Sequence, residues 1–505
     1  MLSRHRWLGV AAIVGLAAIG FAAPSAGAAV PAAGSCPWVG STAPIPQRVA
    51  QVLAQMSLAQ KIQMVHGASG PYVGNIPGIP SLCIPIIWLE DGPNGVGEGL
   101  GGVTQMPAAV AAAATWDTSA EQQYGNVVGS EEFGKGTTID LGPTVNIVRD
   151  PRFGRAFETM SEDPFLAGQL SAAEIQGVQG TGELAQVKHL GVYNQETNRN
   201  SPSDNAIIDP RTQQEIYFPQ FQAAVQQGAA SSVMCSYSFV NGTNACENTA
   251  MLKNALKTQF AFPGFVTSDW GGTHSTVAAA NAGLDMQMPD GGLFGTPLQN
   301  AVNNGQVSMA TLNSMVSRIL TELFTFGLID NPQHAASTGA TVTSTAHQTV
   351  ARNIAEEGTV LLKNSGNVLP FNTSTVRSIA VIGTDATSPQ TAGGGSAAVS
   401  SSGTVTPLQG ITSRASGISV QSQPGDNSGN IAAAVNLARN SSVAVVFASY
   451  FTSEGSDIGN INLSGNSDTL ISQVAAANPN TIVVLNTGSA VTMPWLGSVA
   501  GVLEN

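Results

Sequence analysis

The chain has few charged side chains and few aromatic ones. Charged residues make up 10% of its 505 residues and aromatic residues 6%, with 19 lysines and arginines against 32 acidic residues. At a net charge of −13 there is no basic stripe to hold phosphates, so we do not expect nucleic acid as a partner. Apolar residues make up 43%, which is enough to fill a core, so the low charge does not indicate disorder.

Long apolar runs are absent except near the N-terminus. Two arginines precede an apolar stretch from Leu8 to Phe21, and small residues follow from Ser25 to Ala28. This order predicts a secretory signal peptide over residues 1–29. A membrane anchor requires about 20 apolar residues, and this stretch is shorter and is followed by Pro24. We therefore expect a secreted, extracellular protein that does not enter a membrane in its mature form.

Cysteine is scarce, and the four cysteines of an exported protein can all be paired. Cys235 and Cys246 flank a turn-rich segment over residues 241–244, which predicts a local disulfide. The pairing of Cys36 with Cys83 follows by elimination. The chain has neither a C-x-x-C motif nor clustered histidines, so we expect no metal site.

The length of the chain predicts two or three domains. From about Pro46 to Asp330, short apolar runs alternate with helix-like windows, among them an amphipathic stretch from Val49 to Val65. Strands are expected at Thr138 to Leu141, Gln186 to His189, Ser232 to Ser236 and Gly264 to Ser268. Repeated strand and helix over this length suits a (β/α)8 barrel, in which catalytic groups lie at the carboxyl ends of the strands.

A segment rich in serine, threonine and alanine follows the barrel pattern. It predicts a linker over residues 335–347, between a barrel domain at 30–334 and a second domain at 348–505. In the second domain, strands are expected at Ile379 to Gly383, Val443 to Ala448 and Thr481 to Asn486, with a helix at Ser467 to Ala477. Such valine and isoleucine runs predict a parallel sheet covered on both faces. The glycine- and serine-rich piece over 391–403 is either a functional loop or a mobile one.

Asp269 is the most informative single residue. It directly follows the expected strand from Phe265 to Ser268. At the carboxyl end of a barrel strand, such a side chain points into the open mouth of the barrel, where catalytic groups collect. The alternative is that Asp269 caps the following helix. The adjacent Trp270 favours a binding site, because sugar rings stack their apolar C–H faces on indole.

Several polar segments occur in an order that carries more information than any one of them. They are DGPNGV from Asp91, RDPRFGR up to Arg155 followed by SEDP, KH at Lys188, MCSY from Met234, SDW up to Trp270, and GLDMQMP from Gly283. Over nearly the whole mature chain they resemble glycoside hydrolase family 3, in its β-glucosidase branch. ARNIAEEGTVLLKNSGNVLPF, over residues 351–371, resembles the start of the family's second domain. The resemblance implies an α/β fold, a TIM-like (β/α)8 barrel followed by an α/β/α sandwich, with the active site at their junction.

The resemblance also implies site residues and a reaction. Asp269 matches the family nucleophile, and Glu454 in the segment TSEGSDIGNINL matches the acid/base. The sugar contacts implied are Asp91, Arg155, Lys188, His189, Met234, Tyr237, Trp270 and Ser396. The implied activity is a retaining β-glucosidase that releases terminal β-D-glucosyl residues from a carbohydrate substrate without cofactor or metal. The expected electrostatics are a raised pKa for Glu454 and an Asp269 kept ionised by Lys188 and Arg155.

Three features depart from the family pattern. Gly97 and Glu98 stand where many relatives have an arginine, Ile458 follows Asp457 where many have Asp-Arg, and relatives continue beyond the last residue, so we expect an incomplete second domain. The alternatives are a β-xylosidase, a β-N-acetylglucosaminidase, and an inactive relative that only binds sugar. Oligomeric state and aglycone preference stay open.

Overall fold

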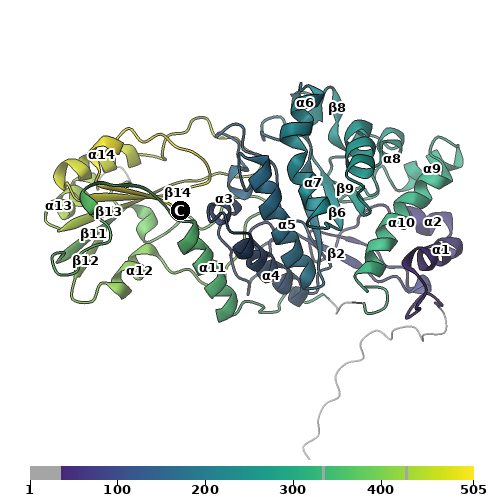
Figure 1. Ribbon diagram of the computed structural model, residues 1–505, viewed down its shortest axis with the longest axis horizontal. Helices are drawn as coiled ribbons and strands as arrows, with labels where there is room; N and C mark the ends of the chain where they lie inside the picture. Colours follow the sequence, from purple (N-terminus) through teal and green to yellow (C-terminus); the bar gives the residue numbers. More distant parts are fainter. Residues whose placement is uncertain (1–35, 333–335, 427–429) are drawn as a thin grey trace, which may run out of the picture.

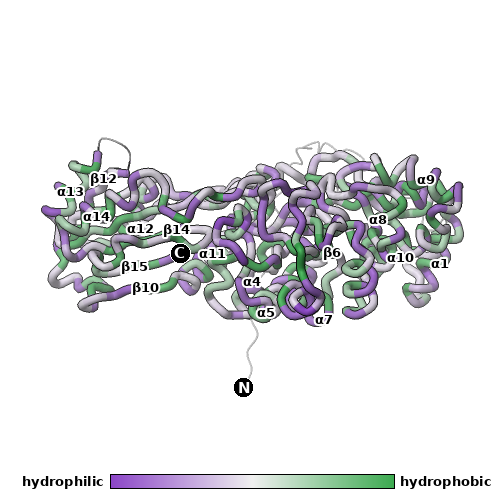
Figure 2. The backbone as a smooth tube through the Cα atoms, turned by 90° about the horizontal axis from the view of Figure 1, so that it is seen from above, coloured by the Kyte–Doolittle hydropathy of each residue, from purple (hydrophilic) through white to green (hydrophobic). Residues whose placement is uncertain are grey.

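The computed structural model describes residues 36–332, 336–426 and 430–505. The predicted signal peptide, residues 1–29, lies outside the described residues. Two units lie end to end along the longest axis of the molecule (Figures 1 and 2). No helix among the described residues is both long and apolar enough to cross a bilayer.

The first unit is built around a six-stranded sheet in the order β1-β2-β3-β4-β6-β9, parallel except for the pair β1 and β2. The strands are β1 (Gly74–Ile76), β2 (Ile87–Glu90), β3 (Ile139–Asp140), β4 (Leu184–Leu190), β6 (Ser232–Cys235) and β9 (Phe265–Ser268). A small separate sheet holds β5 (Asn205–Ala206), β7 (Phe239–Val240) and β8 (Thr243–Asn244). The four strands expected from the sequence are therefore β3, β4, β6 and β9.

Single bridges close this sheet into a barrel. Residue 267 of β9 pairs with 286, 287 pairs with 66, and 68 pairs with 75 of β1. The predicted TIM-like barrel is confirmed, with one difference from the regular pattern. β1 runs antiparallel to β2, because Pro77 and Gly78 turn the chain directly after β1 without a crossover helix.

The barrel helices pack around the outside of the strands (Figure 1). They are α1 (Ile45–Gln55), α2 (Leu58–Gln63), α3 (Ala109–Ala113), α4 (Thr118–Lys135), α5 (Pro164–Gly180), α6 (Pro210–Thr212), α7 (Pro219–Gln226), α8 (Val277–Ala282), α9 (Thr296–Asn303) and α10 (Met309–Thr325). The amphipathic stretch expected from Val49 to Val65 is helical but is divided between α1 and α2. Ser57 interrupts it: its side chain accepts a hydrogen bond from the backbone of Gln60, whose side chain accepts one from the backbone of Ser57, so a new helix starts there.

The second unit is a six-stranded sheet in the order β10-β15-β14-β13-β11-β12, with α11 (Thr345–Gly358) leading into it. The strands are β10 (Val360–Asn364), β11 (Ser378–Ile382), β12 (Ser419–Gln423), β13 (Val443–Tyr450), β14 (Thr481–Thr487) and β15 (Gly501–Glu504). All pairs are parallel except β10 with β15. α14 (Ser467–Ala477) matches the predicted helix, and α11 begins within the predicted linker.

Helices cover both faces of the sheet in its centre but not at its edge. α13 (Ile431–Arg439) and α14 pack on one face, and α12 (Pro407–Arg414) packs on the other over β11. At β10, Leu361 and Leu362 are each 50% exposed. The prediction of a sheet covered on both faces is therefore wrong at this edge.

Both predicted disulfides are present. Cys235 and Cys246 are joined with their Cα atoms 5.3 Å apart, and Cys36 and Cys83 with theirs 6.3 Å apart. The first holds the loop after β6, which contributes to the site below. The second ties the chain before α1 to the turn before β2.

Three carboxyl groups are buried together behind the mouth of the barrel. A Cβ on Gly92 would meet both Asp140 Oδ1 and Glu132 Oε1, so only glycine fits between these two acids. Burial raises the pKa of Glu90 to about 8 and also raises the pKa values of Glu132 and Asp140. Their protons are therefore held in the folded protein at pH values where the unfolded chain has lost them.

These acids predict a protein that is less stable at pH 8 than at pH 5. An unfolded carboxyl ionises near its ordinary pKa of about 4, whereas the folded groups stay protonated, so folding stability falls by about 1.4 kcal/mol per pH unit for each retained proton until the raised pKa is reached. We expect Glu90→Gln to flatten the dependence of the thermal midpoint on pH, measured by calorimetry between pH 5 and 8. The exposed Glu215→Gln should leave it unchanged, and equal slopes in the two variants would refute this account.

Candidate active site

The carboxyl ends of strands from both sheets meet where the two units join. Asp91 follows β2, His189 lies in β4, and Asp269 follows β9. In the second unit the chain leaves β13 and reaches Glu454. Because side chains at these ends converge on one mouth in barrel folds, residues far apart in sequence become neighbours.

Asp269 is buried at the centre of this mouth, with 6% of its surface exposed. Its Oδ1 accepts a hydrogen bond of 2.7 Å from the backbone of Trp270, and its Oδ2 accepts none among the described residues. That free oxygen lies 3.6 Å from His189 Nε2. The helix-cap alternative is excluded, because the next helix, α8, begins only at Val277.

The ends of β2 and β4 place His189 and the ion pair of Lys188 with Asp91 near Asp269. His189 is held by Asn146, whose Oδ1 lies 3.0 Å from His189 Nδ1. Burial and the nearby Arg155 lower the pKa of His189 well below its ordinary value, so the ring is neutral. Lys188 Nζ lies 3.3 Å from Asp91 Oδ1, and burial raises the pKa of Asp91 to about 6 although Lys188 opposes this.

Glu454 is held by groups from both units. Its Oε2 accepts the backbone N–H of Ser396 at 2.8 Å, and its Oε1 lies 3.4 Å from Arg155 and 2.7 Å from Arg199. Arg155 also donates to the hydroxyl of Ser396 and pairs with Glu158. The glycine-rich piece over 391–403 is thus a loop of the candidate site.

Glycine is required where this loop meets the acid. Gly395 has a φ of +97°, and a Cβ there would lie 2.3 Å from Glu454 Cβ. Gly97, where many relatives carry arginine, has a similar constraint, because a Cβ on it would lie 2.9 Å from Asp91. Close packing of the backbone therefore accounts for the missing side chain at position 97.

The expected electrostatics of the two acids are wrong for this structure. Burial raises the pKa of Glu454, but Arg155 and the hydrogen bonds from Ser396 and Arg199 outweigh it and hold the pKa of Glu454 well below its ordinary value. Burial raises the pKa of Asp269, and Arg155 only partly opposes this. The positive charges sit closer to Glu454 than the sequence could indicate.

Sequence reasoning missed three residues of this cluster, namely Glu196, Arg199 and Asp457. Arg199 pairs with Glu196 at 2.9 Å as well as with Glu454, and its guanidinium lies 4.8 Å from the ring centre of Tyr237. Glu196 accepts the backbone N–H of Gly455 at 2.7 Å. The only signal for Arg199 in the sequence was its charge, eleven positions after Lys188.

Asp457 anchors the loop of Glu454 to the barrel. Its carboxylate accepts backbone hydrogen bonds from Glu196 at 2.9 Å, from Thr197 at 2.7 Å and from Gly154 at 3.0 Å. Two barrel loops are therefore tied to one side chain of the second unit. This contact explains how the loop is held although Ile458 replaces the arginine of many relatives.

The remaining predicted residues differ in their placement. Tyr237 donates its hydroxyl hydrogen to the carbonyl of Trp270 at 3.0 Å, so both lie beside Asp269. Trp270 also donates its indole N–H to the carbonyl of Val73. Met234 is buried in the barrel core on β6, packed among apolar side chains. The described residues contain no group of three or more histidine, cysteine, aspartate or glutamate side chains that could hold a metal ion.

Similar proteins fit this arrangement. Residues 79–322 match the glycosyl hydrolase family 3 N-terminal domain, and residues 359–505 match its C-terminal domain. The thermostable beta-glucosidase B of Acetivibrio thermocellus is 35% identical over 90% of this chain, and the exo-alpha-(1->6)-L-arabinopyranosidase of Bifidobacterium longum is 32% identical over 89%. The chain spans 62% of the length of each of these relatives.

A solved structure is similar over both units. The crystal structure of DesR, a beta-glucosidase from Streptomyces venezuelae in complex with D-glucose, superposes with a TM-score of 0.85 at 33% identity. The match covers 90% of this chain and 74% of that one. Both family domains and this likeness lead to one conclusion: the chain belongs to glycosyl hydrolase family 3.

Proposed function

We propose that the protein is a secreted, retaining β-glucosidase that releases terminal β-D-glucosyl residues from β-glucosides and cello-oligosaccharides. The observation that carries the proposal is that the carboxyls of Asp269 in the barrel and Glu454 in the second unit lie near enough to interact electrostatically. Arg155 interacts electrostatically with both carboxyls. Asp91 and Lys188 add hydrogen-bonding groups suited to sugar hydroxyls.

The reaction needs two carboxyls in different roles. Asp269 attacks the anomeric carbon through Oδ2, the oxygen without a hydrogen bond, while Glu454 donates a proton to the leaving oxygen. Water then releases the sugar from Asp269, with Glu454 as the base. Neutral His189 lies beside Asp269, and the Trp270 backbone N–H holds its Oδ1. Both steps use these residues and water.

The first step requires Glu454 in its protonated form, which Arg199 opposes. Because Glu454 loses its proton as the pH rises through its pKa, activity should fall on the basic side of that pKa. The carboxylate form suits the second step, in which Glu454 takes a proton from water. We therefore infer that Arg199 favours release of the sugar over its capture.

Arg199→Met tests this assignment. Removing the positive charge should raise the pKa of Glu454, so the basic limb of the kcat/KM profile should move to higher pH. Because the ionised Glu454 that Arg199 stabilises serves release of the sugar, loss of Arg199 should also lower kcat by about tenfold to a hundredfold where release limits the rate, without a matching fall in kcat/KM. The exposed Arg211→Met serves as the control and should change neither quantity. A basic limb that stays in place in Arg199→Met would refute the role of Glu454 in that limb.

Substrate choice is tested with a panel of aryl glycosides. We expect the β-glucoside to be hydrolysed with the highest kcat/KM among β-glucoside, β-xyloside, β-N-acetylglucosaminide and α-L-arabinopyranoside. The last is included because a relative over 89% of this chain is named an arabinopyranosidase. If another glycoside gave the highest kcat/KM, that sugar and not glucose would be assigned as the one the protein releases. Binding of glucose without hydrolysis of any of the four would favour the inactive, sugar-binding alternative.

A further inference from the structure

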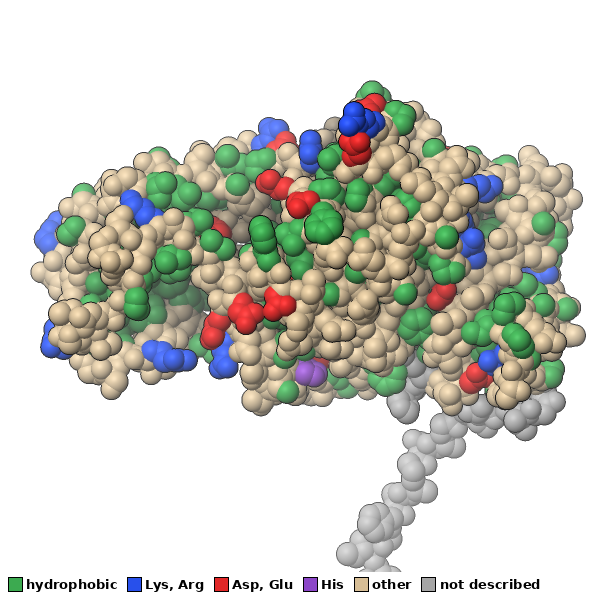
Figure 3. Space-filling view, viewed as in Figure 1, with side chains coloured by type: hydrophobic (Ala, Val, Ile, Leu, Met, Phe, Trp, Pro, Cys, Tyr) green, Lys and Arg blue, Asp and Glu red, His purple; other side chains and the backbone are tan. Residues whose placement is uncertain are grey.

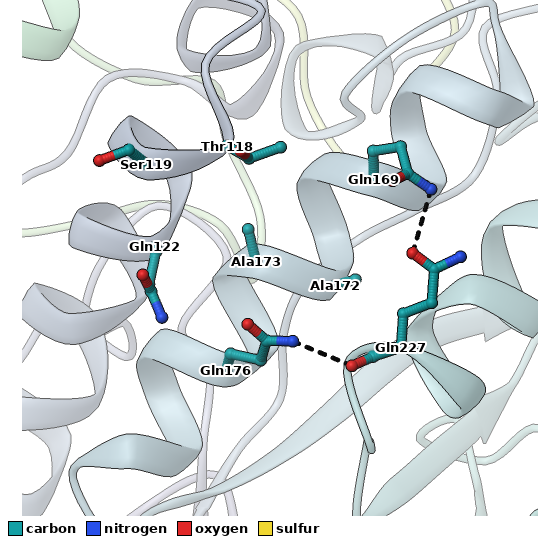
Figure 4. Close-up of a pocket in the computed structure, with 8 residues that line it drawn as sticks. All are labelled: Thr118, Ser119, Gln122, Gln169, Ala172, Ala173, Gln176 and Gln227. Carbon is teal, nitrogen blue, oxygen red and sulfur yellow. Dashed lines mark hydrogen bonds between the residues drawn. The ribbon is translucent and has the colours of Figure 1, made fainter.

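A groove of about 310 Å³ lies on the outside of the barrel, between α4, α5 and the end of α7 (Figure 4). Its walls consist of uncharged polar side chains over a floor of two alanines. The polar residues are Thr118, Ser119, Gln122, Gln169, Gln176 and Gln227. Gln227 accepts hydrogen bonds from Gln169 and Gln176, whereas the amide of Gln122 has no partner among the described residues. The groove therefore offers free donors and acceptors without charge.

Two exposed aromatic residues are near neighbours in sequence of residues that line this groove: Trp116 comes two positions before Thr118, and Phe165 lies one helical turn before Gln169 on α5. Trp116 is 77% exposed and Phe165 is 71% exposed. Trp116 has a φ of +56°, a left-handed backbone that bulky residues rarely adopt. On this face of the molecule, hydrophobic side chains gather over α3 and the start of α5 (Figure 3).

The packing of α4 on α5 places these two rings at the same end of the groove. The helices run parallel and close together. Gly125 lies against the carbonyl of residue 174, and Gly129, one turn later, lies against the carbonyl of residue 178, four positions further along α5. Trp116 precedes α4 by two residues and Phe165 is the second residue of α5, so both lie at the N-terminal ends of these parallel helices. Since packed helix axes lie about 8–10 Å apart, one extended ligand can contact both rings and the polar wall.

The chemistry of the groove selects a neutral, hydroxyl-rich ligand. Amide side chains both donate and accept hydrogen bonds, as sugar hydroxyls require, and aromatic faces stack on the apolar faces of sugar rings. Asp117 and Asp163, which cap α4 and α5 at the aromatic end, would repel an anion. We propose that this groove is a second, non-catalytic site that holds a β-glucan chain, an inference that rests on the proposed function for its choice of glucan.

The test is electrophoresis of the whole protein in native gels that contain soluble β-glucan. The wild type should be retarded relative to a gel without glucan. The double variant Trp116→Ala, Phe165→Ala should bind about tenfold more weakly, as expected for the loss of two stacking rings. Ile207→Ala, which removes another exposed apolar side chain (80% exposed), should be retarded like the wild type.

Turnover of a small aryl β-glucoside separates this proposal from the proposed function. Equal turnover by the wild type and the double variant, with retardation lost only in the double variant, would support the second site. Equal retardation of both, or no retardation of a wild type that hydrolyses the aryl glucoside, would overturn it. A wild type that is retarded through these rings but hydrolyses no glycoside would leave the second site standing and refute the proposed function.

Discussion

Asp269→Asn is expected to lower kcat on aryl β-glucosides by about 10⁴-fold to 10⁶-fold, the range seen when an enzyme loses its nucleophile. An amide oxygen of nearly the same shape cannot form the covalent bond to the anomeric carbon. Because burial raises the pKa of Asp269, a neutral side chain at this position carries no extra desolvation cost. We therefore expect binding of glucose and the thermal midpoint to stay close to those of the wild type.

The control for Asp269→Asn is a neighbouring acid with no place in the pocket. Asp290→Asn changes a carboxylate in the loop that follows the last barrel segment. It should retain activity within a factor of a few. A fall in kcat of less than about 100-fold in Asp269→Asn, with purity verified by mass spectrometry, would contradict its role as the nucleophile.

Glu454→Ala should have the second-largest effect, and the effect should depend on the leaving group. A general acid contributes about 10²-fold to 10⁴-fold, and this contribution is lost only where the leaving oxygen needs a proton. We expect a loss of that size in kcat/KM on cellobiose and a far smaller one in kcat/KM on dinitrophenyl β-glucoside, because kcat/KM reports the first step and not the later release of the sugar. Azide, a small anion that fits the space left by the carboxylate, should restore turnover and give a β-glucosyl azide.

Glu357→Ala is the matched control, because Glu357 is exposed on α11 and the change is the same. It should leave activity on both substrates unaltered. If Glu454→Ala lowered kcat/KM equally on cellobiose and on the dinitrophenyl substrate, Glu454 would have a structural role only. An α-glucosyl azide as product would contradict retention.

The elements that could be predicted are those whose signal is local. The buried run from Thr481 to Asn486 lies in β14, and the helix from Ser467 to Ala477 matches α14, because both carry their apolar pattern within a few residues. The break at Ser57 was missed although its capping box is visible in the sequence, since the apolar period continues across it. The reversed strand β1 depends on barrel closure, which no local pattern records.

The site was predictable to the extent that motifs mark it. Asp269 and Glu454 could be named from their motifs, whereas Arg199 could not, because its importance comes from a contact with a residue 255 positions away. The anchoring by Asp457 likewise joins segments 260 positions apart. The pKa directions of the two acids follow from such contacts, so the electrostatic expectation, which was made from the motifs alone, was wrong.

The central claim is that Asp269 forms a covalent bond to the sugar. Incubation with 2-deoxy-2-fluoro-β-glucosyl fluoride, which forms the intermediate quickly and releases it slowly, followed by proteolysis and mass spectrometry, tests it most directly. We predict one fluoroglucosyl group per chain, on the peptide that contains Asp269 and not on any other acid. An active enzyme that gains no label, or that carries the label on another residue, would contradict the account.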